Sequence, residues 1–276
     1  MTERTFIGAA ERSDAWRAHL LRLSAPLGER LRLGEGLLLA VNAAVLWLGP
    51  ADLASALIRF AVSAAVLATA YSVNDFVDAE ADRSNPKKSA RLVALLLVDR
   101  AAFARVLVGV HAGLVLVAGV AVSPAAAASV AGMLLVNLVY SRWAKGTPGL
   151  DLAVVALWGG LFTAIAAAPA GVCALVGALT VLMHAFQMQV DVDVDAGNAV
   201  RTTAVVARRP LALVAGACLL VAGVVYFLLG PAAALTAAVP LAAQVGLRRP
   251  QAAWACSRAF AAVVLLLALG GVPGAA

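Results

Sequence analysis

The amino-acid sequence predicts an all-α polytopic membrane protein, a single bundle of nine transmembrane helices. Hydrophobic residues make up 63% of the 276 positions, charged residues make up 13%, and the mean hydropathy is +0.94. Soluble domains are about half apolar and about a quarter charged. Long apolar stretches, such as residues 101–122 and 211–229, can cross a hydrocarbon core of about 30 Å as helices. Strands of alternating polarity are not evident, so the pattern does not favour an outer-membrane barrel.

Glycine, proline and charged residues divide the chain into successive apolar segments. The first segment is short and carries Glu35 and Asn42. We expect one helical domain over residues 33–276, preceded by a cytoplasmic or interfacial segment over residues 1–32. In that segment "DAWRAHLLRL" is amphipathic, with Trp16, Leu20 and Leu23 opposite Arg17 and Arg22, which indicates a helix lying on the membrane surface. The predicted spans are 33–50, 52–75, 101–122, 124–141, 150–168, 171–192, 210–229, 231–247 and 251–272.

Among the connections, only alternate ones contain basic residues, and only Arg59, Arg105 and Arg258 fall within the predicted helices. The connections after the first, third, fifth and seventh segments are short and contain no Lys or Arg. Those after the second, fourth, sixth and eighth are basic, and the N-terminal segment adds six arginines. Short basic loops stay in the cytoplasm. We therefore expect a plasma (inner) membrane protein with a cytoplasmic N-terminus and an external C-terminus. The net charge of +6 then reflects topology and gives no indication of nucleic-acid binding.

Two acidic clusters lie on this basic side. The stretch "NDFVDAEAD" (Asn74–Asp82) ends the second segment, and Asp75, Asp78 and Asp82 follow the i, i+3, i+7 spacing of one helical face. The sixth segment ends with Asp191 and Asp195 at i, i+4, while Asp193 lies on the other flank.

Carboxylates at membrane helix ends need compensation. A charge near the bilayer centre costs about 2.5–3.5 kcal/mol, and carboxylates on one face repel each other. Mg²⁺ prefers carboxylate oxygens and commonly shares its shell with phosphates. Two acidic sets surrounded by bases therefore favour a diphosphate site, and a prenyl diphosphate has the matching charged head and apolar tail. The candidate metal ligands are Asn74, Asp75, Asp78, Asp82, Asp191 and Asp195; the bases beside the first cluster are Arg83, Lys87, Lys88 and Arg91.

Further polar residues face the expected interior. His184 and Gln187 recur with Asp191 and Asp195 at near-helical intervals, and His184 lies about 10 Å deeper than Asp191. His184 is a candidate for orienting an acceptor or serving as a base, with packing as the alternative, and Gln187 is a second candidate for binding substrate. Asn42 and Asn137 are candidates for lining the same cavity, with interhelical hydrogen bonding as the alternative.

These motifs resemble the UbiA superfamily of intramembrane prenyltransferases. "NDFVDAEAD" matches its N-D-x-x-D-x-x-x-D signature, and Asp191 and Asp195 match its second motif. "YSRWAK" (Tyr140–Lys145) is similar to the loop after its fourth helix. The resemblance implies a nine-helix bundle around a central cavity, opening to the cytoplasm and binding Mg²⁺ as two ions. It implies catalytic roles for Asp75, Asp78, Asp191, Asp195, Tyr140 and Lys145, and substrate binding by Arg201, which falls at the family's Arg-Thr pair.

Three positions depart from the family pattern. Leu92 follows Arg91 where the family has proline, Ala199 replaces a glycine four residues after Asp195, and Asp151 stands where asparagine is frequent. None of the three changes removes an expected metal ligand.

The expected activity is Mg²⁺-dependent ionisation of a prenyl diphosphate, followed by transfer of the prenyl group to an aromatic, quinonoid or other small acceptor. One alternative is a membrane terpene cyclase of the same superfamily, which uses the same ionisation. A cation-coupled transporter is an alternative of another class, but it predicts acidic residues near mid-helix and broken helices.

Overall fold

The computed structural model describes residues 17–28, 31, 36–49, 52–84, 89–197, 199–207, 209–247 and 249–271. All regular structure within these residues is helical, which confirms the predicted fold class. Six helical stretches are long and apolar enough to cross a membrane: α3 (Leu53–Asp78), α5 (Arg100–Ala121), α6 (Pro124–Val139) with η2 (Tyr140–Ala144), α8 (Ala170–Gly197), α10 (Pro210–Leu229) and α13 (Pro250–Gly271).

Three further apolar helices are shorter. They are α2 (Leu37–Leu48), α7 (Leu150–Ala164) and the broken helix Pro231–Leu247, which consists of α11 (Pro231–Ala234), η3 (Leu235–Ala237) and α12 (Ala238–Leu247). Each predicted segment corresponds to one of these helices. The count of nine spans is not confirmed, because six of the segments reach the required length and three do not.

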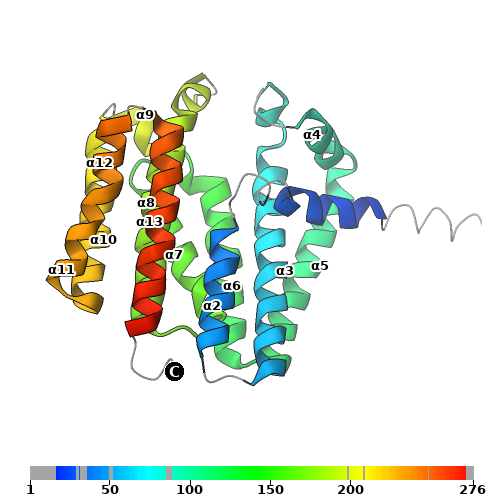
Figure 1. Ribbon diagram of the computed structural model, residues 1–276. Helices are drawn as coiled ribbons and strands as arrows, with labels where there is room; N and C mark the ends of the chain where they lie inside the picture. Colours follow the sequence, from blue (N-terminus) through cyan, green and yellow to red (C-terminus); the bar gives the residue numbers. More distant parts are fainter. Residues whose placement is uncertain are drawn as a thin grey trace, which may run out of the picture.

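The basic connections gather at one end of the bundle. Figure 1 shows the α3–α5, α6–α7, α8–α10 and α12–α13 connections at the top, with the end of α13 at the bottom. Two short helices that the sequence pattern did not predict, α4 (Ala90–Leu97) and α9 (Thr203–Ala207), lie in these top connections. The ends of α3 and α8, which carry the acidic motifs, are therefore at the same end.

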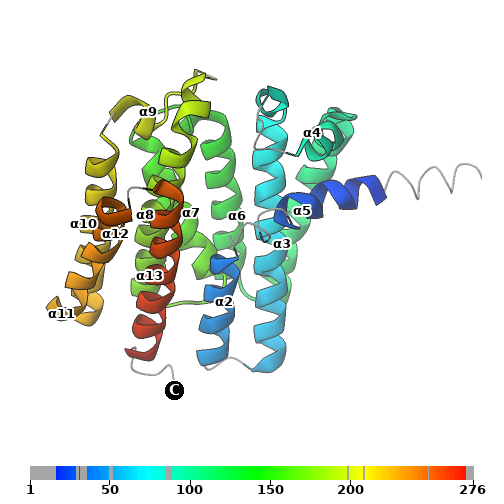
Figure 2. The same cartoon turned by 45° about the horizontal axis from the view of Figure 1, so that its top comes forward.

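Residues 17–28 form a helix that lies across the bundle (Figures 1 and 2). The Ser72 hydroxyl of α3 lies 2.9 Å from the Leu23 carbonyl oxygen and ties the helix to the bundle. Arg22 was expected on the polar face, but it is only 3% exposed, and its guanidinium stands 5.4 Å from the Phe103 ring centroid. Leu20 is exposed, so the two faces differ from the predicted division. Trp16 lies outside the described residues, and the interfacial position stays a prediction.

Helix α8 forms the centre of the bundle and packs against α7, α10 and α13. In the most apolar 18-residue stretch of α8, 61% of the residues are buried. In the corresponding stretch of the peripheral helix α5, 17% are buried. Small residues permit the close approach of α7 and α8, as in other membrane helix pairs. A Cβ at Gly159 would stand 2.3 Å from Thr180 Oγ1, and one at Gly177 would stand 2.7 Å from the Ala156 carbonyl oxygen. This contact fixes α8, and with it the second acidic motif, relative to the rest of the bundle.

Candidate active site

The first acidic motif straddles the end of α3. Asp75 is 4% exposed, and Asp78, with 16% of its side chain exposed, is the last residue of the helix. The chain turns at Ala79 and Glu80, and Asp82 belongs to the separate 3₁₀ helix η1 (Ala81–Ser84). The expected common helical face therefore applies to Asp75 and Asp78 and is wrong for Asp82.

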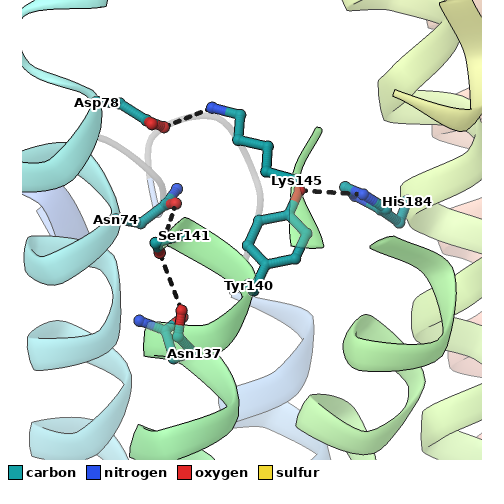
Figure 3. A network of polar contacts seen from close by, with 7 residues as sticks. All are labelled: Asn74, Asp78, Asn137, Tyr140, Ser141, Lys145 and His184. Carbon is teal, nitrogen blue, oxygen red and sulfur yellow. Dashed lines mark hydrogen bonds and ion pairs between the residues drawn. The ribbon is translucent and has the colours of Figure 1, made fainter. Parts of the chain in front are cut away.

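A five-residue π-helical turn, η2, lies between the two acidic helices (Figure 3). The Lys145 amide donates to the Tyr140 carbonyl oxygen at 3.0 Å, which closes the wide turn. Such turns interrupt α-helices most often at functional sites. The Lys145 ammonium lies 2.5 Å from Asp78 Oδ2, so η2 brings a cation directly to the first motif.

Ser141 of the same turn supports Asn74. Its hydroxyl is 3.2 Å from Asn74 Oδ1 and 3.0 Å from the Asn137 carbonyl oxygen (Figure 3). Asn137 in turn donates its amide to the Ala70 carbonyl oxygen of α3 at 3.0 Å. These bonds hold α6 and η2 against the face of α3 that carries Asn74 and Asp78.

The second motif occupies the last turns of α8. Asp191 and Asp195 are both half-buried and Asp193 is exposed, as their i, i+4 spacing indicates. Lys145, Asp191 and Asp78 are close enough to Asp195 to act on it electrostatically. Both acidic motifs therefore converge on Lys145, although 116 residues separate Asp75 from Asp191.

Helix α8 ends in a left-handed turn. Val200 donates its amide to the Asp195 carbonyl oxygen at 2.8 Å, and Ala199 donates to Ala196 at 3.2 Å. This is the bond pattern of a Schellman motif, which places a left-handed residue, usually glycine, after the helix. Ala199 has φ +57°, so the alanine that departs from the family pattern occupies the left-handed position.

Asp151, the third departure, anchors the chain after this turn. It is fully buried in the first turn of α7, where its Oδ2 accepts the Thr203 amide at 2.8 Å and its Oδ1 accepts the Leu152 amide at 2.8 Å. The Thr203 hydroxyl also donates to Oδ1. Both carboxylate oxygens act as acceptors, which a carboxylate satisfies and an amide cannot. Asp151 thus connects α7 to the segment that follows the second motif.

A cavity of about 170 Å³ lies beside these polar residues. Asn74, Asn137, Tyr140, His184 and Gln187 form its polar wall. The Tyr140 hydroxyl is 3.2 Å from His184 Nε2 (Figure 3). Gln187 lies close enough to His184 to interact with it. The remaining wall is mostly apolar or aromatic and consists of Leu38, Tyr71, Val154, Val155, Trp158, Thr180 and Met183.

Several predicted substrate-binding residues do not line this cavity, and their role stays a prediction. Arg83 is exposed and pairs with Glu80 at 2.9 Å, and Arg91 and Arg201 are exposed. Lys87 and Lys88 lie outside the described residues.

Asn42 is fully buried. Its amide donates to Ser63 Oγ at 2.9 Å and to the Phe162 carbonyl oxygen at 3.1 Å. The geometry therefore gives Asn42 an interhelical role rather than a place on the wall of the cavity.

The donors of a metal site are present without a preformed cage. Among the described residues, no three Asp, Glu, His or Cys side chains converge to hold an ion. The donors are divided between the end of α3 and the end of α8, with Lys145 between them. Such a set fits Mg²⁺, which usually takes one or two protein carboxylates and completes its shell with water and substrate phosphate.

Four residues of the site were not singled out from the sequence. Tyr71 precedes Asn74 by three positions, so helical spacing places both on one face. Ser141 lies inside the "YSRWAK" stretch, where the resemblance to the family concerns the tyrosine and the lysine. Trp158 stacks on Phe162 with ring centroids 5.9 Å apart and also lines the cavity. Thr203 had no sequence signal, because its partner is 52 residues away.

Comparison with known proteins identifies the family. The model of the UbiA prenyltransferase family matches residues 36–270. No curated protein matches the chain in sequence. The fold is similar to that of a UbiA homologue from Archaeoglobus fulgidus. The structure of that homologue with DMAPP and Mg²⁺ superimposes with a TM-score of 0.65 at 17% sequence identity. The match covers 90% of this chain and 99% of the homologue's chain. The structure of that homologue with GPP and Mg²⁺ has a TM-score of 0.62 at the same identity and coverage. Because the family model covers most of the chain, the protein belongs to the UbiA prenyltransferase family.

Proposed function

We propose that the chain is a Mg²⁺-dependent intramembrane transferase that ionises a prenyl diphosphate and transfers the prenyl group to an aromatic, quinonoid or other small acceptor. The observation that carries this proposal is that Lys145 pairs with Asp78 at the end of α3 and is also close enough to act electrostatically on Asp195 at the end of α8, beside a largely apolar cavity. The homologue from Archaeoglobus fulgidus, which shares the fold, was solved with Mg²⁺ and either DMAPP or GPP.

The head of the donor belongs at the acidic end of the bundle. Asn74, Asp75 and Asp78 on one side, with Asp191 and Asp195 on the other, would hold Mg²⁺, and Asp82 is a further donor beyond α3. Bound there, Mg²⁺ supplies charge neutralisation for the departing diphosphate. Lys145 contributes a mobile cation that can leave Asp78 for a diphosphate oxygen, and this stabilises the charge that develops as the bond breaks.

The prenyl tail belongs in the cavity. When the bond from C1 to oxygen breaks, its electron pair leaves with the diphosphate and an allylic cation remains. Tyr71, Trp158 and Tyr140 line this space, and aromatic rings of this kind can attract a cation through their quadrupoles. The apolar wall excludes water, which would otherwise quench the cation. A nucleophilic atom of the acceptor then bonds to C1, and the proton that the acceptor loses passes to the released diphosphate.

His184 and Tyr140 are positioned to orient the acceptor. Their mutual hydrogen bond joins η2 to α8 across the cavity, and Gln187 adds an amide one turn nearer to Asp191. The basic residues of the top connections support a cytoplasmic opening, with the N-terminus on the same side and the C-terminus outside.

Replacement within the second motif tests the function. Asp191→Asn removes a half-buried carboxylate at the acidic end, and we expect turnover of geranyl diphosphate to fall about 100- to 1000-fold. Asp193→Asn is the matched control, because Asp193 lies in the same turn and is exposed. Both variants should insert in the membrane and melt like the parent.

Turnover should also stop when EDTA removes the metal. Full activity of Asp191→Asn, or activity that survives EDTA, would contradict the proposal. Incubation with donor and no acceptor separates transferase from cyclase, since a cyclic hydrocarbon product would identify a cyclase.

A further inference from the structure

Arg100 lies at the basic end of the bundle, yet its side chain packs against α3. It is the first residue of α5 and is half-buried. Its Nη2 donates to the Phe76 carbonyl oxygen of α3 at 3.1 Å, and its guanidinium carbon stands 4.4 Å from the centroid of the Phe76 ring. Its Nη1 is buried, and no described residue is a hydrogen-bond partner of that atom. The contacts of this cation are therefore concentrated on one residue of the first acidic motif.

The start of α5 places Arg100 beside the end of α3. Asp99 caps α5, since its side chain accepts the Ala102 amide at 3.2 Å. The backbone of Asp99 is left-handed, with φ +43°, a conformation that aspartate adopts more readily than most residues. This cap sets the residue at which α5 begins, and from there the guanidinium of Arg100 reaches the last turn of α3.

Phe76 belongs to a helix end that carries excess negative charge. It lies in the last turn of α3, between Asp75 and Asp78. The carbonyl groups of a last helical turn lack intrahelical partners and form the negative end of the helix dipole. Carboxylates at this end are unfavourable, whereas a cation there is favourable. Arg100 thus stabilises a helix end that the carboxylates of the motif destabilise.

Arg100 and Lys145 hold the first motif from different sides. Successive residues of a helix are about 100° apart, so Phe76 and Asp78 face directions about 200° apart. Lys145 pairs with Asp78, and under the proposed function it moves to the diphosphate of the donor. Arg100 binds a backbone carbonyl and does not line the cavity, so it can keep the helix end in place while Lys145 moves.

Further ring contacts support Phe76 from the side of α5. The buried Phe103, one turn after Arg100, meets Phe76 edge to face with ring centroids 5.6 Å apart. Arg22 of the N-terminal helix stands 5.4 Å from the Phe103 centroid. Phe76 is therefore held between Arg100 and a buried ring, which restricts rotation of the last turn of α3.

We propose that Arg100 is a positioning residue for the metal site. By binding the backbone and the ring of Phe76, it holds the end of α3 in the orientation in which Asp75 and Asp78 bind Mg²⁺. This inference rests on the proposed function, because it needs Mg²⁺ and a donor between the two motifs. It predicts that loss of Arg100 weakens the binding of Mg²⁺ and leaves donor binding at saturating Mg²⁺ nearly unchanged.

Binding of the non-ionisable donor geranyl thiolodiphosphate to the full chain in detergent tests the proposal. Calorimetric titrations at a series of Mg²⁺ concentrations give the concentration at which donor affinity reaches half of its maximum. We expect Arg100→Met to raise this concentration about 10-fold, while donor affinity at saturating Mg²⁺ stays within about twofold of the wild-type value. A role in general stability would not shift the Mg²⁺ dependence in this way.

A conservative variant and a control assign the effect to one residue. Arg100→Lys should restore the Mg²⁺ dependence to within about threefold, because an ammonium keeps the charge and can donate to the carbonyl. Arg105→Met is the matched control, since it removes an exposed arginine from the same helix and should keep the wild-type Mg²⁺ dependence. A wild-type dependence in Arg100→Met, or an equal shift in Arg105→Met, overturns the proposal.

Amide hydrogen exchange measures the effect at the motif itself. In Arg100→Met the amides of residues 77–82 should exchange faster, while those at the centre of α8 should exchange at the wild-type rate and so report a folded bundle. If exchange is faster throughout the bundle, the comparison passes to Arg100→Gln, which keeps an N–H group and loses the charge. Arg100→Gln should shift the Mg²⁺ dependence in the same direction, and a wild-type dependence in that variant overturns the proposal.

The wild-type protein separates this proposal from the proposed function. If it does not bind geranyl thiolodiphosphate with Mg²⁺, the proposed function fails. If it binds the donor and the Arg100 variants keep the wild-type Mg²⁺ dependence, the positioning role alone fails.

Discussion

The two acidic motifs of this bundle are held in place by different means. At the first motif, side chains of η2 contact motif residues directly, since Lys145 pairs with Asp78 and Ser141 contacts Asn74. At the second motif, the structure fixes the end of α8 through the chain that follows it, by the Schellman turn at Ala199 and the bonds from Asp151 to Thr203. Side chains therefore contact the first motif directly, whereas the second motif is held through the segment that follows it.

This difference suits a site that opens and closes around a charged substrate. An ammonium on a flexible stem can move from Asp78 to a diphosphate oxygen without moving a helix. A helix end that is fixed by backbone hydrogen bonds keeps its carboxylates in position while the partner side changes. Replacements at the first motif should thus affect turnover most, and replacements behind the second motif should affect stability most.

The largest effect is expected at Lys145. Lys145→Met removes the cation between the motifs, so we expect kcat with geranyl diphosphate to fall about 100- to 1000-fold while the melting temperature changes little. Arg142→Met is the control, because Arg142 belongs to the same turn and is exposed. Equal losses in the two variants would mean that Lys145 contributes general positive charge and has no specific role at the first motif.

Much of the fold follows from composition and the spacing of charge. The apolar segments and the basic connections predicted the longer helices but not α4 or α9, and helical spacing alone brought Asp191 and Asp195 to one face. The break at Asp82 was not predictable in this way. Residues Asp78–Asp82 consist of aspartate, alanine and glutamate, which tolerate a helix, so local preference gives no signal for the turn at Ala79.

Long-range partners account for the other differences. In the sequence, an Asn42 that lines a cavity looks the same as an Asn42 that joins helices. Its hydrogen-bond partners, Ser63 and Phe162, are 21 and 120 residues away along the chain. Arg22 carries a charge that usually faces water, yet an aromatic ring of α5 covers it. Neither contact can be predicted from a single sequence, because both depend on how the helices pack against each other.

An intermediate effect is expected at Asp151. Asp151→Ala leaves the Thr203 amide without its buried acceptor, and we expect the free energy of unfolding to fall by about 2–3 kcal/mol. Asp151→Asn should lose less, since an amide keeps one acceptor. Asp52→Ala is the control, because Asp52 also begins a helix and accepts the Ser55 amide at 3.0 Å. Asp52 is exposed, so its replacement should lower the free energy of unfolding by only about 1 kcal/mol. Denaturant unfolding in detergent measures all three, and an equal cost at both aspartates would contradict an anchoring role for Asp151.

The smallest effect is expected at Ala199, and its sign is favourable. Ala199→Gly relieves the left-handed conformation of an alanine and should stabilise the protein by about 1 kcal/mol. Ala196→Gly is the control, three residues earlier in helical conformation, where glycine should destabilise by a similar amount, about 1 kcal/mol. Thermal melting of the two variants should therefore shift in opposite directions. If kcat of Ala199→Gly stays at the wild-type value, the turn supports the second motif through stability alone; a lower kcat would mean that the strained turn also sets the position of Asp195.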